Sequence, residues 1–135
     1  MTPDQLTLAS QLAEALDLRG PATPPYLRAG EDARLRVEGG ALWRTYAHAV
    51  EYGWVLDLAD AATGGVLVAP LVAAAKAAGR IVRVDCDYRD ELFVEVLPLD
   101  RYGGTVISKG ARYYEHTLGE ACARALIAIH EGEKT

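Results

Sequence analysis

The sequence predicts an α+β protein in which a small antiparallel sheet of about three to five strands carries packed helices. Capping sequences and apolar residues at helical spacing mark one helix near the start of the chain and another near its end. A third apolar run precedes two stretches of alternating apolar and polar residues separated by turns, which is typical of short strands. From residue 57 onward the expected order is helix–strand–strand–strand–helix, an arrangement like an α-β-α sandwich.

Length and composition indicate one domain spanning 1–135. The chain is 50% apolar and 24% charged, the ordinary balance of a globular protein. These values exclude a disordered tail, a collagen-like repeat and a coiled coil, and two cysteines are too few for a disulfide framework. The net charge of -5 excludes a broad basic surface for phosphate backbones, so we expect no nucleic-acid partner.

The sequence also predicts where the protein resides. It opens without a basic stretch followed by an apolar one, so we expect no signal peptide. Its most apolar run, Val66–Ala78, contains Pro70 and Lys76 and is too short to cross a bilayer. We therefore expect no membrane association and a cytoplasmic location, that of the host cell if the gene is phage-encoded. There Cys86 and Cys122 should remain thiols.

The first third of the chain contains one helix and an irregular segment. A helix over 3–18 is predicted by the Thr2–Gln5 capping box with Pro3 at the first helical position. Residues 20–58 are predicted to be irregular because Pro and Gly are frequent at their start. Within them, 33–47 could form a hairpin around Gly39–Gly40.

A second helix is expected over 61–78. Asp57 and Asp60 are both plausible caps, and Gly79 ends the helix. Because Pro70 lies inside it, we expect either a kink near 66–69 or two short helices.

Three strands should follow. The first, 81–88, places Val82, Val84, Cys86 and Tyr88 on one face and Ile81, Arg83, Asp85 and Asp87 on the other. After a tight turn at Arg89–Asp90, residues 92–97 form the second strand. A turn at 102–104 leads to the third strand, 105–108.

The last helix covers 117–131 and begins with a Thr117–Glu120 capping box. This helix and the one over 61–78 should pack on the Val82, Val84 and Val96 face of the sheet, in a helix–sheet–helix core over 59–131. Cys86 and Cys122 both lie on predicted core faces, so buried free thiols are expected.

The opposite face of the sheet carries Ile81, Phe93 and Leu97 among charged residues. This face is too apolar to be left bare, so we expect the N-terminal helix or the 33–58 segment to cover it.

No catalytic constellation, metal site or cofactor motif is predicted. His48, His116 and His130 lack a carboxylate or nucleophile at a recognisable spacing, and helix capping explains Asp57 and Asp60 without a metal. An enzyme using His116 with Asp85 or Asp87 has little support. The helix–three strands–helix order is also that of double-stranded-RNA-binding domains, but the lysines those domains place at the last helix are missing here.

Two segments resemble a known family. The run Asp57–Leu67, of the form Asp-x-x-Asp-x-Ala-Thr-x-Gly-x-Leu, and the segment Thr117–Ala128 are similar to stretches of small uncharacterised bacteriophage and prophage proteins with the phage α-β-α sandwich domain. The resemblance covers about 55–131 and departs from the family at Pro70, where the family's helix runs unbroken. It implies a fold and a viral or prophage origin, and it carries no catalytic residues.

The leading functional hypothesis is a small non-enzymatic phage-type accessory protein that binds a host or phage protein. It rests on the resemblance and on the missing catalytic constellation. A homo-oligomer stays open, and Tyr113 and Tyr114 beside His116 would make a reasonable self-association patch.

The alternative is a protein that binds or sequesters a small nucleotide-like molecule. Arginines and lysines around the strand ends would hold it and tyrosines would stack on it. The candidate residues are Arg83, Arg89, Arg101, Tyr102, Lys109, Arg112, Tyr113 and His116, with Arg80, Tyr88 and Tyr114 as further members of the set.

Overall fold

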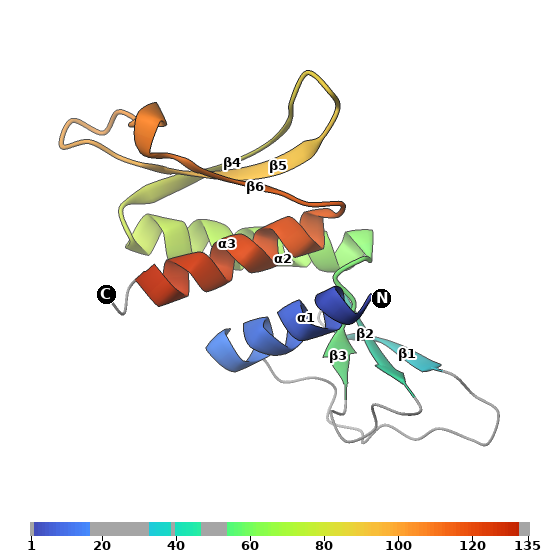
Figure 1. Cartoon of the computed structure of the whole chain (residues 1–135). Helices are drawn as coiled ribbons and strands as arrows, with labels where there is room; N and C mark the ends of the chain where they lie inside the picture. Colours follow the sequence, from blue (N-terminus) through green and yellow to red (C-terminus); the bar gives the residue numbers. More distant parts are fainter. Residues whose placement is uncertain (1, 17–32, 39, 47–53, 133–135) are drawn as a thin grey trace.

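The computed structural model describes residues 2–16, 33–38, 40–46 and 54–132 (Figure 1). The fold is α+β. Its elements are α1 (Pro3–Leu16), β1 (Ala33–Glu38), β2 (Ala41–Tyr46), β3 (Val55–Leu56), α2 (Ala61–Ala77), β4 (Arg80–Cys86), β5 (Leu92–Pro98), the short 3-10 turn η2 (Ile107–Lys109), β6 (Ala111–Tyr114) and α3 (Leu118–Gly132). None of the described helices is long and apolar enough to cross a membrane.

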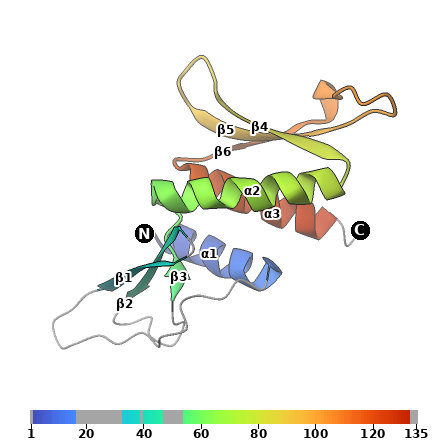
Figure 2. The ribbon, with the colours of Figure 1, turned by 180° about the vertical axis from the view of Figure 1, so that it is seen from behind.

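The elements form layers (Figures 1 and 2). The antiparallel sheet β4-β5-β6 lies on one side of the helix pair α2 and α3, while α1 and a second sheet, β1-β2-β3, lie on the other. One cluster of buried apolar residues runs through all these layers, from Leu12 of α1 through Leu71 and Leu126 of the helix pair to Val94 of β5. The helix pair therefore contributes to both apolar interfaces.

The capping box predicted for the first helix is present. The backbone N–H of Gln5 donates to the hydroxyl of Thr2 at 3.2 Å, and the amide oxygen of Gln5 accepts from the N–H of Thr2 at 2.8 Å. Leu8, Ala9 and Leu12 form the buried face of α1, which packs against α3. The described helix ends at Leu16, so the last two residues of the expected range lie outside the described residues.

The predicted hairpin is confirmed, but it belongs to a separate sheet. β1 and β2 pair antiparallel from Ala33 opposite Tyr46 to Glu38 opposite Ala41. Gly40 adopts a φ of 80° at the turn, a conformation that glycine adopts without steric cost. The short strand β3 then pairs with β2, a strand that the sequence pattern did not indicate. The proline- and glycine-rich stretch at 20–32 lies outside the described residues.

α2 is one continuous helix, so the expectation of two short helices is wrong. Asp60 is its N-cap and accepts a hydrogen bond from the N–H of Thr63 at 3.1 Å. Asp57 instead shapes the turn before the helix, because its carboxylate accepts from the N–H of Ala59 at 3.0 Å. Pro70 lies within the helix on its exposed side.

The sheet β4-β5-β6 contains the predicted hairpin but not the predicted third strand. β4 and β5 pair with Val82 opposite Val96 and Arg83 opposite Glu95, joined through a turn in which Asp90 has a φ of 59°. Residues 105–108 were expected to form the third strand. Thr105 makes only an isolated bridge, Ile107 begins η2, and β6 starts at Ala111. The strand begins later than predicted because the 3-10 turn η2 uses residues 107 and 108, which the pattern assigned to the strand.

The prediction that the N-terminal helix or the 33–58 segment covers the Phe93 and Leu97 face of β4-β5-β6 is also wrong. α2 and α3 both pack on the face that carries Val94 and Val96, and α1 lies beyond them with the β1-β2-β3 sheet (Figure 1). No described helix or strand covers the opposite side of β4-β5-β6. We call this side the outer face.

One cysteine prediction is confirmed and the other is wrong. Cys122 of α3 is buried and Cys86 is exposed, and both are free thiols. Cys86 is exposed because β4 is an edge strand, on which only Val82 is even half-buried.

A close contact fixes the start of α3. Gly119 lies against the carbonyl of Leu58, so a Cβ at this position would collide with the Leu58 oxygen. The hydroxyl of Thr117 donates to the same carbonyl at 2.8 Å. Gly64 of α2 faces the backbone of Gly119, where a Cβ would lie 2.9 Å from the Gly119 nitrogen.

We predict that Gly119→Ala lowers the free energy of unfolding by about 3 kcal/mol, because the backbone at Leu58 must move to admit a methyl group. Gly65→Ala is the matched control on α2, where nothing lies within 4 Å, and it should stabilise the protein by about 0.5–1 kcal/mol. Urea denaturation measures both values. A Gly119→Ala variant as stable as wild type would contradict the close contact.

Candidate functional site

The outer face is built around β5. Because successive strand residues point to opposite sides, Val94 and Val96 pack toward the helices and Phe93, Glu95 and Leu97 lie on the outer face. These three side chains are nonetheless buried, and neither Phe93 nor Leu97 belongs to the main apolar core. They must therefore be covered by neighbours on the same face.

Two arginines from the flanking strands meet on Glu95. The Nε of Arg112 on β6 lies 2.6 Å from Oε2 of Glu95, while Nη2 of Arg83 on β4 lies 2.9 Å from Oε1. Strand register explains this, since both arginines stand directly opposite Glu95. The Glu95 side chain is 4% exposed, whereas those of Arg83 and Arg112 are 48% and 42% exposed.

This contact changes the ionisation of Glu95. The hydrogen bond from Arg112 lowers the pKa of the Glu95 carboxyl, the positive charges of both arginines lower it further, and burial opposes them. Glu95 thus stays ionised while buried. The group of Arg83, Glu95 and Arg112, which we call the arginine bridge, carries one net positive charge.

The arginine bridge also covers Phe93. The guanidinium carbons of Arg112 and Arg83 lie 4.6 and 5.5 Å from the centre of the Phe93 ring, and the ring centre of Tyr114 lies 5.3 Å away. Guanidinium groups bind aromatic faces through the ring quadrupole, and their apolar stems add packing area. Phe93 is therefore 2% exposed although none of the described helices lies over it.

The outer face keeps hydrogen-bonding capacity for a ligand. A guanidinium carries five N–H donors, of which the contacts to Glu95 use only some. Arg112 also donates to the hydroxyl of Tyr114 at 3.2 Å, and Arg83 has a loose contact of 3.9 Å with Asp85. This arrangement can bind a carboxylate or another hydrogen-bond acceptor.

The other predicted binding residues are not gathered at this place. Arg89 lies over the Tyr88 ring in the β4–β5 turn, and Arg101 lies over Tyr102 in the β5–β6 connection. Those two connections stand at opposite ends of the sheet (Figure 1). Lys109 ends η2. Of the eight candidates, the structure brings Arg83 and Arg112 together and leaves the remaining six elsewhere.

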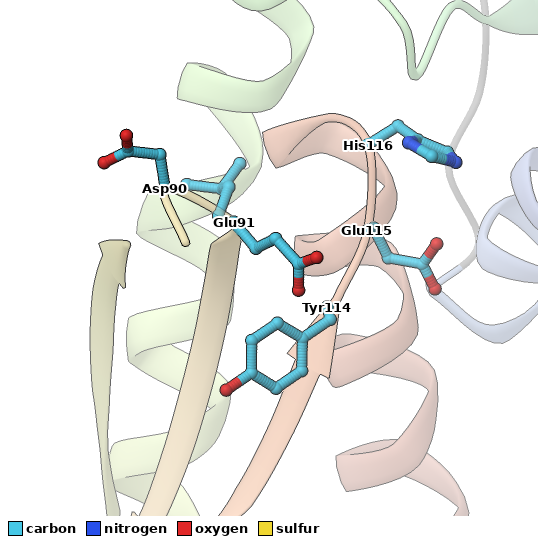
Figure 3. Close-up of a pocket in the computed structure, with 6 residues that line it drawn as sticks. Asp90, Glu91, Tyr114, Glu115 and His116 are labelled. Atoms are coloured by element: carbon cyan, nitrogen blue, oxygen red, sulfur yellow. The ribbon is translucent and has the colours of Figure 1, made fainter. Parts of the chain in front are cut away.

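Tyr113 and His116 lie away from the arginine bridge. Tyr113 packs against the core on the helix side of the sheet, and burial raises the pKa of its hydroxyl. His116 borders an open depression of about 420 Å³ with Glu91, Tyr114 and Glu115. Figure 3 shows Glu91 and Tyr114 turned toward each other and His116 turned away from both.

This depression does not suit phosphate or a metal ion. Three of its six lining residues, Asp90, Glu91 and Glu115, are acidic, which repels a phosphate group. Asp85 and Asp87, the proposed partners of His116 in an enzyme, do not line it. Within the part of the chain that the structure describes, no group of three or more His, Cys, Asp or Glu residues could hold a metal.

A second hollow was missed by the sequence reasoning. A crevice of about 240 Å³ between α1 and β3 is lined by Trp43 and Trp54. Both tryptophans are evident as apolar residues in the sequence, but it is the pairing of β2 with β3 that brings them to the same crevice.

Comparison with known proteins does not assign the chain to a family. No family model matches it, and neither a curated protein nor a solved structure shows significant similarity to it. The phage resemblance in the sequence remains a prediction. The proposed function therefore rests on the geometry of the outer face.

We predict that Glu95→Gln lowers the free energy of unfolding at neutral pH by about 1 kcal/mol. Hydrogen bonds to charged groups contribute more than neutral ones, but solvent screens the half-exposed arginines. Because folding lowers the pKa of Glu95, its contribution is complete above the ordinary value of 4.5 and disappears as the pH falls through the folded-state pKa.

Urea denaturation over a series of pH values tests this. The stability difference between wild type and Glu95→Gln should be constant at neutral pH and shrink in acid. Glu14→Gln, at an exposed position on α1, should change stability by less than about 0.5 kcal/mol. A difference that does not depend on pH would show that Glu95 is not held ionised by the arginines.

We predict that the two thiols differ in reactivity. Cys86 is exposed, whereas burial raises the pKa of Cys122 to about 11. Iodoacetamide should therefore modify Cys86 in the native protein and reach Cys122 only after unfolding, since the thiolate is the reactive form. Mass spectrometry of the labelled peptides measures both rates, and equal rates in the native protein would contradict the burial of Cys122.

Proposed function

We propose that this protein is a non-enzymatic accessory protein that acts by binding another protein on its outer face. The phage or host origin of that partner comes from the sequence resemblance alone. The place of binding comes from one observation, the arginine bridge over Phe93 on a sheet face that no described element covers.

The composition of the outer face supports a protein partner. Arginine and aromatic side chains dominate the residues that contribute most to protein–protein affinity. Arg83, Arg112 and Tyr114 are such residues, and each is between 42% and 48% exposed. Contacts with Glu95 and Phe93 already hold them, so little side-chain entropy is lost on binding.

The charge of the arginine bridge favours an acidic segment in the partner. Because two guanidinium groups share one carboxylate, N–H groups remain that can donate hydrogen bonds to a second carboxylate. The net charge of -5 on the whole chain repels an acidic partner at long range. Recognition therefore depends on short-range contacts at Arg83 and Arg112.

The alternative function, binding of a nucleotide-like molecule, stays a prediction without a specific observation in its favour. Apart from Arg83 and Arg112, the candidate arginines and tyrosines lie at separate places on the sheet, and the depression that His116 borders is acidic.

Affinity capture with surface variants tests the proposal. Wild-type protein, the double variant Arg83→Ala/Arg112→Ala and the control Arg124→Ala are immobilised and exposed to lysate of the source cells. Arg124 lies on α3, is 46% exposed and pairs with Glu115, so it matches the outer-face arginines in exposure and ion pairing. A partner of the outer face should be retained by wild type and Arg124→Ala, and reduced at least about tenfold by the double variant.

Photocrosslinking locates the contact. Benzoylphenylalanine at Tyr114 should crosslink the retained protein, and benzoylphenylalanine at Gln11, an exposed position on α1, should not. Equal retention by the double variant, crosslinking only from Gln11, or no retained protein would each overturn the proposal.

A further inference from the structure

We propose that two copies of this chain pair antiparallel along their β4 strands, joining the two β4-β5-β6 sheets into one continuous sheet. The inference rests on the backbone of the β4 edge, and it shares only Arg83 with the proposed function.

β4 is a free edge with the properties that allow pairing. Among the strands that the structure describes, it pairs with β5 alone; it is seven residues long, contains neither Pro nor Gly, and includes Ile81, Val82 and Val84. Such an edge presents unpaired N–H and C=O groups to another strand. Val84 is 42% exposed, although it lies on the side of the sheet that faces the helices.

The backbone hydrogen bonds fix which residues face outward along this edge. Asp87 N–H donates to Glu91 at 3.0 Å, and Leu99 N–H donates to Gly79 at 3.0 Å, in the same register as the strands between them. Hydrogen-bonded pairs alternate in an antiparallel ladder, so Arg83 and Asp85 bond to β5. Val82, Val84 and Cys86 direct their N–H and C=O groups away from β5.

Charge complementarity favours one register and indicates that the strand paired with β4 belongs to a second copy of this chain. With Val84 opposite its equivalent, Arg83 of each copy lies opposite Asp85 of the other, giving two opposite-charge pairs on the outer face. Val82 of each copy then lies opposite Cys86 of the other. If the pairing were centred on Arg83, the two Arg83 side chains would lie opposite each other and repel. The same charges that discourage unrelated strands therefore complement a copy of this strand.

α2, the helix beneath β4, has a mainly apolar exposed surface. α2 packs against β4, whereas α3 packs against β5 and β6. The exposed residues of α2 include Ala69, Val72 and Ala73, and Lys76 is its only charged residue. A helix that is apolar on all sides is normally buried. A copy added at β4 approaches this surface and reduces its exposure to water.

Sedimentation velocity at increasing protein concentration is the primary test. Wild type should approach twice the 14.5 kDa chain mass. Val84→Pro should stay monomeric with unchanged circular dichroism, because proline removes an outward N–H and no bond to β5. Val84→Thr keeps the N–H and should still dimerise. Asp85→Arg, which keeps the edge but creates like-charge pairs, should weaken dimerisation about tenfold or more.

Oxidative crosslinking tests the register. In a Cys86→Ser background, Val84→Cys should form a covalent dimer, because directly opposite strand residues have Cα atoms about 5.5 Å apart, within disulfide range. Arg83→Cys in the same background should form no covalent dimer. A wild type that stays monomeric, a Val84→Pro variant that still dimerises, or crosslinking through position 83 would each overturn the proposal.

Discussion

The contact between Gly119 and the carbonyl of Leu58 determines how the layers of this protein fit together. It brings the start of α3 against the segment that leads into α2, and Gly64 lets the two helices approach at the same point. The hydroxyl of Thr117 satisfies the Leu58 carbonyl, and the buried carboxylate of Glu120 accepts from the side chain of Gln5 on α1 at 2.8 Å. One junction therefore orients three helices, and the positions of both sheets follow from it.

The outer face shows how a sheet can bury large side chains without a second layer. Phe93 is enclosed by two guanidinium groups and a tyrosine, and Glu95 is enclosed by the groups that it neutralises. The arginines gain a fixed carboxylate, and in return their stems keep water from the ring. This mutual support gives a polar surface with a set geometry, which suits recognition. It also explains how so apolar a set of strand residues can stand under solvent-exposed arginines.

The sequence predicted the features that depend on local interactions, such as helix caps and turns. Capping residues located three helices. Alternation placed Arg83 and Glu95 on the same face of the sheet, but a two-residue turn at Arg89–Asp90 would pair Arg83 with Val96. The turn has three residues, 88–90, and this places Glu95 opposite Arg83. Arg112 could not be added to that pair, because β6 follows a connection whose 3-10 turn left no period-two pattern. Alternation placed Phe93 and Leu97 on one face, but it cannot say whether a helix or arginine stems cover them. Cys86 was misjudged because alternation does not distinguish an edge strand from a central one.

The hydrogen bond from Gln5 to Glu120 joins residues that are 115 positions apart. During synthesis, α1 leaves the ribosome before α3, the helix that it packs against, has been made. At ordinary elongation rates of about 5–20 residues per second, this interval lasts several seconds. The helix pair and the β4-β5-β6 sheet are contiguous in the chain, so they can assemble before α1 docks. The N-terminal helix is thus the element that a chaperone, or a partner encountered during translation, would meet in its unpaired form.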